Sequence, residues 1–157
     1  MINIARGTDI SERVGREVVI RGIEMRGIVK PKTTATEQQT CRVQIIIDKE
    51  PKGAVATSQD INSTTGVMGM YNLDNRKRFI TIFDDIVDLA PYAQGQSKTI
   101  LFKKRLFLPV VFGGTNYGDI RDIQENTILI NCVGTATSGG VQSNSFTGLC
   151  RLRYTDE

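Results

Sequence analysis

Arginine side chains on two distant segments are the residues of this sequence best suited to chemistry. Arg151 and Arg153 are two residues apart near the C-terminus, and Arg16, Arg21 and Arg26 belong to a segment near the N-terminus. If both segments are strands and neighbours, these side chains form a cationic surface without an obvious row of acidic partners. Such a surface binds the phosphate backbone of nucleic acid and needs no base-reading geometry.

A second interpretation of the arginines is purely structural. Arginines at strand edges prevent unwanted strand pairing and form surface ion pairs, for which Glu12, Glu17 and Glu24 are available. Periodicity alone slightly favours this second interpretation. The basic runs at 76–78 and 103–105 are open to the same two interpretations.

Carboxylates give a weaker signal. Asp84 and Asp85 are adjacent and point to opposite faces of a strand, so they cannot form a facing catalytic dyad. Asp84 and Asp88 share a face but lie roughly 13 Å apart along it. Asp119 and Asp122 fall in a polar loop, where they contact a neighbouring subunit or a cation, or simply keep the loop soluble.

The composition removes most enzyme classes. The 157 residues include no histidine, which excludes Ser-His and Cys-His catalysis and most zinc chemistry. Cys41, Cys132 and Cys150 are isolated, which favours buried free thiols over a disulfide framework. The net charge of +3 is only mildly basic. No stretch is apolar enough to span a membrane, and we expect no membrane partner.

Hydrophobic patterns predict an all-β fold that positions these residues. Residues 15–30 (GREVVIRGIEMRGIVK) read as one long strand, whose glycines permit a bend or bulge. Residues 57–61 predict one helical turn capped by Thr57 or Ser58, and Pro109 is expected to end a strand. Further strands are predicted at 41–49, 67–71, 78–89, 98–108, 110–112, 127–134 and 146–154.

About eight strands with hardly any helix indicate an antiparallel sandwich or barrel, and an eight-stranded jelly roll is a leading candidate. We expect residues 1–15 to be an arm leading into one domain at 16–157.

Several ordered segments resemble the single jelly-roll capsid proteins of small circular Rep-encoding single-stranded DNA viruses. The chain is also similar to the coat protein of satellite tobacco necrosis virus. The resemblance covers nearly the whole length, and no single motif in it is catalytic. It rests on GTDISERVGREVVIRGIEMRG at 7–27, VQIIIDKEPKGAVATSQDI at 43–61, LDNRKRFITIFDD at 73–85, the strand at 127–134 and RLRYTDE at 151–157.

The resemblance implies a non-enzymatic structural protein of the virion, assembled inside the host cell. It implies a jelly roll of two four-stranded sheets, with the first and last strands in the sheet that faces the genome. About sixty copies would close an icosahedral shell around single-stranded nucleic acid, with circular DNA as the expected cargo. The implied nucleic-acid-binding residues are Arg6, Arg16, Arg21, Arg26, Arg151 and Arg153, and the implied subunit-interface residues are Arg76, Lys77, Asp119, Arg121 and Asp122.

The sequence departs from the family at its N-terminus, and the resemblance also implies a weak candidate for a metal ligand. Members of the family usually begin with an arginine-rich arm, whereas Arg6 is the only basic residue before Ser11. About sixty copies at +3 supply roughly 180 charges against about 471 phosphates in the reading frame alone. We therefore expect a basic arm upstream, with charge compensation by small cations as the alternative. Some relatives bind structural Ca²⁺ at subunit contacts, where Asp156 is a weak candidate ligand; otherwise no cofactor is expected.

Two other classes of protein compete with this interpretation. A β-sandwich carbohydrate-binding module would expose aromatic platforms, and the chain has no Trp and only four Tyr. A jelly-roll enzyme of the cupin type normally uses histidine ligands, which the sequence lacks.

Overall fold

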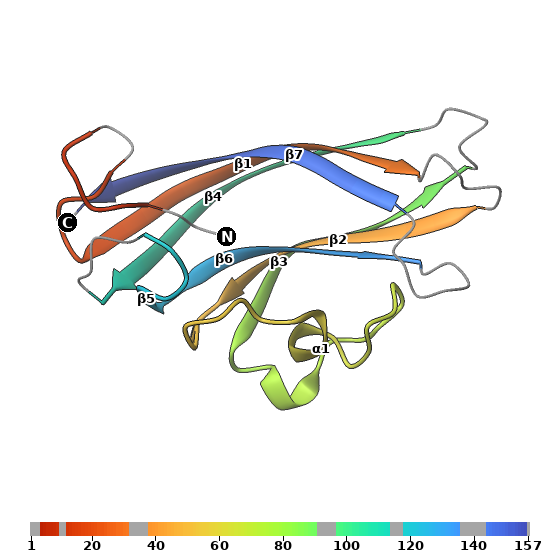
Figure 1. The fold of residues 1–157 in the computed structure, drawn as a ribbon, viewed down its shortest axis with the longest axis horizontal. Helices are drawn as coiled ribbons and strands as arrows, with labels where there is room; N and C mark the ends of the chain where they lie inside the picture. Colours follow the sequence, from red (N-terminus) through yellow and green to blue (C-terminus); the bar gives the residue numbers. More distant parts are fainter. Residues whose placement is uncertain are drawn as a thin grey trace.

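The computed structural model describes residues 4–9, 12–31, 38–90, 97–113, 118–135 and 144–156. These segments form two antiparallel β-sheets with two very short helices (Figure 1). The all-β sandwich expected from the sequence is therefore confirmed. The described residues contain seven strands rather than the expected eight.

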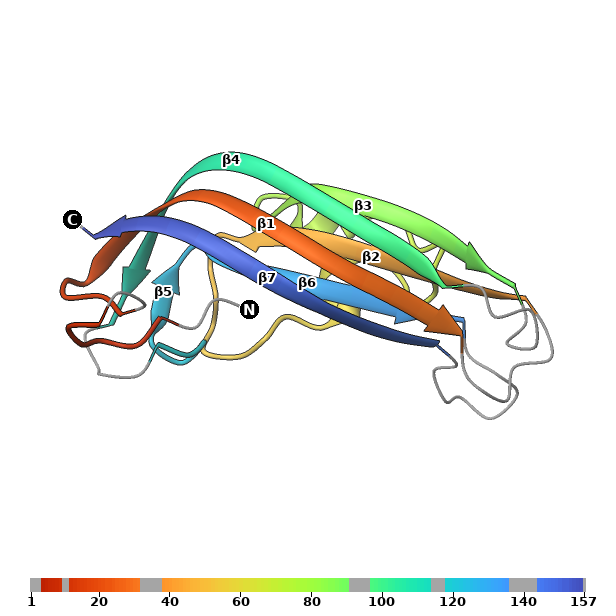
Figure 2. The same cartoon turned by 90° about the horizontal axis from the view of Figure 1, so that it is seen from above.

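One sheet has four strands and the other has three. The first and last strands, β1 (Glu17–Pro31) and β7 (Asn144–Asp156), pair along most of their length, as expected (Figure 2). The second sheet is one strand short of the expected four within the described residues. The four-stranded sheet has the order β5 (Ile123–Glu125), β4 (Lys98–Phe112), β1 (Glu17–Pro31) and β7 (Asn144–Asp156). The three-stranded sheet has the order β3 (Phe79–Leu89), β2 (Gln39–Asp48) and β6 (Thr127–Gly134).

Strand β1 is bent by a bulge, as its glycines predicted. Its register with both β4 and β7 shifts between Ile20 and Gly22, which leaves Arg21 at the irregular position. Further along, a Cβ on Gly27 would lie 2.4 Å from the Phe146 ring, so any other residue there would force this aromatic side chain to move. The bulge lies within a strand of 15 residues that curves along the sandwich (Figure 2).

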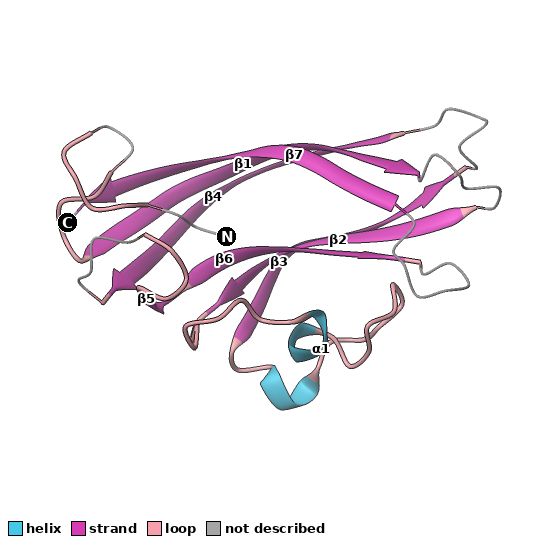
Figure 3. Ribbon diagram, viewed as in Figure 1, coloured by secondary structure: helices cyan, strands magenta, loops and turns pink. Residues whose placement is uncertain are grey.

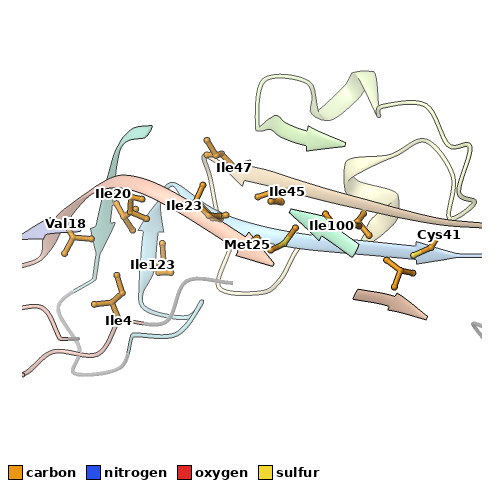
Figure 4. Close-up of a cluster of buried hydrophobic side chains, with 14 of the residues drawn as sticks. Ile4, Val18, Ile20, Ile23, Met25, Cys41, Ile45, Ile47, Ile100 and Ile123 are labelled. Atoms are coloured by element: carbon orange, nitrogen blue, oxygen red, sulfur yellow. The ribbon is translucent and has the colours of Figure 1, made fainter. Parts of the chain in front are cut away.

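The core lies between the two sheets (Figure 4). Ile20 and Met25 of β1 face inward, and Ile45 of β2 is likewise fully buried. Phe83 of β3 meets Phe102 of β4 with ring centroids 5.0 Å apart, which joins the two sheets along that side. Burial of β-branched and aromatic side chains from both sheets supplies the main stabilisation, at about 25 cal/mol per Å² of apolar surface.

The connection between β2 and β3 covers the outer face of the three-stranded sheet (Figure 3). It contains helix α1 (Ser58–Ile61) and a 3-10 helix (Leu73–Asn75). Thr57 caps α1 in a reciprocal capping box with Asp60, which confirms the predicted helical turn. The cover explains why Ile46 is fully buried although it points away from the core.

Polar side chains of β2 lie beneath this connection and are satisfied there. Arg42 donates from Nε and Nη2 to the Asp84 carboxylate at 2.8 and 2.6 Å. Gln44 and Asn62 exchange amide hydrogen bonds, one of them at 3.0 Å. The Tyr71 hydroxyl also donates to Asp84. The alternation in β2 was predicted correctly, but its polar side is buried.

Three sequence predictions about strands are wrong. Strand β4 does not end at Pro109 but continues to Phe112. Strand β5 pairs only with Val111 and Phe112, so Pro109 has no neighbouring strand on that side of β4. Proline is tolerated there because no strand on that side requires a backbone N–H from it. Residues 67–71 contain only an isolated bridge from Tyr71 and no strand, whereas β5 falls in a stretch expected to be loop.

Neither helix in the described part of the chain is long and apolar enough to cross a membrane.

Candidate functional site

Two rows of charged side chains cross the outer face of the four-stranded sheet. In the first row, Gly22 of β1 lies between Arg105 of β4 and Arg153 of β7. In the second row, Glu24 lies between Lys103 and Arg151. Neighbouring strands are about 4.8 Å apart, so each row brings its side chains within reach of one ligand. The condition set by the sequence, that the first and last strands be neighbours, is therefore met.

A groove of about 370 Å³ opens at the bulge of β1, where the two rows meet. Gly22 leaves room there, because it has no side chain between the two flanking arginines. A Cβ at this position would approach the Lys104 carbonyl oxygen to 3.3 Å. Six of the nine residues lining the groove are cationic. They are Arg21, Lys103, Lys104, Arg105, Arg151 and Arg153.

Glu24 is the one carboxylate that lines this groove. Its Oε1 accepts hydrogen bonds from Arg26 at 3.0 and 2.7 Å. These bonds, with the charges of Arg26, Lys103 and Arg151, hold the pKa of Glu24 below its ordinary value. Glu24 is therefore ionised at neutral pH and offsets one of the surrounding charges, which leaves the groove strongly positive.

Phe107 stands beside the groove and was not identified from the sequence. The residue is 71% exposed, and the Arg21 guanidinium lies 4.8 Å from its ring centroid. Arg21 is itself positioned by a 3.1 Å hydrogen bond from Nε to the Thr155 hydroxyl. The alternation of Lys103, Arg105 and Phe107 along β4 was the available signal, since these residues share one face of a strand.

The structure gathers some of the predicted arginines and separates others. Arg26 lies next to the groove, exposed and bonded to Glu24. Arg16 precedes β1, and Arg6 donates to the Val14 carbonyl in the lead-in segment; neither lines the groove. Binding of nucleic acid by Arg6 and Arg16 stays a prediction, and the groove gives it no support because both residues lie outside it.

The five residues expected at subunit contacts also lie in different surroundings. Arg76 and Lys77 are exposed after the 3-10 helix, while Arg121 is exposed and pairs with Asp119. Asp122 is different, because its carboxylate is buried within the subunit against Arg13. Asp122 therefore supports the fold of its own chain.

Asp156 has partners that bear on the metal expectation. Its carboxylate accepts the backbone N–H groups of Val14 and Gly15, which ties the lead-in to the end of β7. Across the residues that the structure describes, no group of three or more acidic or cysteine side chains is arranged to hold a metal ion. A Ca²⁺ site at Asp156 stays a prediction.

No family model matches this chain, and no curated protein matches it.

Proposed function

We propose that this protein is a viral capsid subunit built on a jelly roll. About sixty copies assemble into a small icosahedral shell, and the outer face of the four-stranded sheet lines the interior. The shell packages single-stranded nucleic acid, with circular DNA as the expected cargo. The fold carries no catalytic step in this proposal.

The basic groove is the observation that carries the proposal. The chain covers the outer face of its three-stranded sheet with its own β2–β3 connection, whereas no described segment covers the groove side of the four-stranded sheet (Figure 1). Five cationic side chains and one carboxylate line the groove on that open face, while Lys104 pairs with the buried Ile23 and borders the groove with its backbone. Phosphate binding without base reading requires a surface of this kind.

The cations also favour a polyanion over a neutral glycan. A carbohydrate-binding module relies on aromatic faces and hydrogen bonds, and a neutral sugar would gain little from five positive charges in one groove. A phosphate backbone gains from each of them, because every contact releases condensed counterions.

The proposal is tested by changing the charge of the groove in purified particles. Arg151→Ala combined with Arg153→Ala is expected to leave folding intact and to lower the ratio of absorbance at the nucleic-acid and protein maxima. Arg151→Lys with Arg153→Lys keeps the charge and serves as the matched control, which is expected to retain most of the cargo. An unchanged ratio in the alanine variant refutes the role of the groove. Lone molecules in sedimentation under all buffers refute the shell.

A further inference from the structure

We infer that Phe107 is a stacking platform for an unpaired base, placed beside the phosphate-binding rows. This inference rests on the proposed function and specifies which form of nucleic acid the groove holds. The ligand it implies is a flexible single strand with accessible bases.

The position of Phe107 on β4 places its ring close to the phosphate-binding rows. Phe107 and Arg105 are two residues apart on β4, so they share a face and lie roughly 7 Å apart along the strand. A phosphate held by Arg105 and Arg153 at the Gly22 notch therefore has an aromatic ring within one nucleotide's reach.

The exposure of the ring carries the second step. Phe107 is 71% exposed, although aromatic side chains are among those that gain most from burial. It stands next to a groove lined mainly by cations. An apolar protein partner that covered the ring would also remove water from these cations without pairing them, which is costly. A nucleotide satisfies both neighbours, because its phosphate meets the cations and its base meets the ring.

Arg21 adds a cationic group beside the exposed ring. Its guanidinium lies 4.8 Å from the Phe107 centroid, and its bond to Thr155 fixes its orientation. The guanidinium covers one face of the ring, so a base on the opposite face would complete a mixed stack of guanidinium, ring and base, an arrangement typical of sequence-tolerant binding of single strands. Paired bases are already stacked within a duplex, so only unpaired ones can reach Phe107.

The test compares three labelled probes of about thirty nucleotides on the full chain. The probes are oligothymidine, an abasic strand with the same number of phosphates, and a duplex; binding is followed by fluorescence anisotropy. The wild type is expected to bind oligothymidine about tenfold more tightly than the abasic strand. Phe107→Ala is expected to abolish this difference and to keep the affinity for the abasic strand, while Phe107→Tyr retains the difference.

Leu101→Ala is the matched control, because Leu101 is similarly exposed on the same strand and does not line the groove. It is expected to behave as the wild type. Equal binding of oligothymidine and the abasic strand by the wild type overturns the stacking role and leaves the proposed function standing. Loss of binding to both strands in Phe107→Ala also overturns it. Failure of the wild type to bind any of the probes refutes the proposed function itself.

Discussion

The Arg13 guanidinium donates to the Asp122 carboxylate at 2.7 Å, and both side chains are excluded from solvent. The two residues are 109 positions apart in the sequence. Arg13 also lies over the Phe112 ring, 4.0 Å from its centroid, and donates to the Gly15 carbonyl. The pair thus fixes the lead-in segment to the end of the four-stranded sheet.

Breaking this pair is expected to destabilise the fold strongly. Asp122→Asn leaves the Arg13 charge buried without its counter-charge, and we expect a loss of about 3–5 kcal/mol in the free energy of unfolding. Denaturant titration measures it. The exposed pair of Arg121 and Asp119 is the control, because water screens this pair and Asp119→Asn should cost far less stability than Asp122→Asn. Equal losses in the two variants would contradict this account of the buried pair.

Acid is expected to weaken the packing of the β2–β3 connection. Burial acts to raise the pKa of Asp84, but hydrogen bonds from Arg42, Tyr71 and Gln44 outweigh it and lower the pKa below 3.8. Because the pKa of Asp84 is lower in the folded protein than in the unfolded chain, its ionised form stabilises the fold at pH values above the unfolded-state pKa. This stabilisation is lost as the pH falls below 3.8 and through the lower pKa of the folded state.

Asp84→Asn should therefore lower stability at neutral pH by about 1–3 kcal/mol and flatten its decline in acid. Thermal unfolding across the acid range measures both effects. Asp74 is exposed on the same connection, and Asp74→Asn is the control that should keep the wild-type pH profile. A wild-type acid profile in the Asp84 variant would rule out the proposed linkage.

Two of the three thiols are expected to resist alkylation near neutral pH. Burial raises the pKa of Cys41 to about 11 and that of Cys132 to about 12. The thiolate is the reactive form, so labelling of both should rise about tenfold per pH unit between about pH 8 and 10. Mass spectrometry after iodoacetamide treatment measures each site. Labelling of Cys132 at the rate of a free thiol at pH 8 would contradict its burial.

Salt dependence should report how many phosphates the groove contacts. If Arg151 and Arg153 each neutralise one phosphate, their joint replacement by alanine lowers the slope of log affinity against log salt by roughly 1.4. Affinity for oligothymidine over a series of salt concentrations gives this slope. Replacement of Lys52, which is exposed and outside the groove, should leave it unchanged. Equal slopes in the wild type and the arginine variant would remove these residues from the contact.

Local pattern predicted the strands well where residue types favour a pleated strand or alternate along it. The long strand at 15–30 follows from its β-branched residues, and the alternation in β2 follows from period-two hydrophobicity. Strand β5 was missed because three residues are too few to show a period. Pro109 was misjudged because its tolerance depends on where β5 stops, which is a property of the sheet.

The site was predicted in part for a similar reason. Arg21, Arg151 and Arg153 could be grouped once β1 and β7 were assumed to be neighbours. The contributions of Lys103, Arg105 and Phe107 depend on β4 pairing with the other side of β1, which no local pattern specifies. The burial of Arg13 could not be foreseen, since its partner is distant in sequence.

The order in which the strands are made has a consequence for the timing of cargo capture. The row of Lys103, Glu24 and Arg151 draws on the beginning, the middle and the end of the chain. A polypeptide that has been made only as far as β3 has Glu24 without either flanking cation, and the row is complete only after residue 151 has been released. Non-local pairing of this kind is also slow to form. Under the proposed function, affinity for polyanions therefore arises only once residue 151 has been made, and unfinished chains are not expected to adhere to the nucleic acids around them.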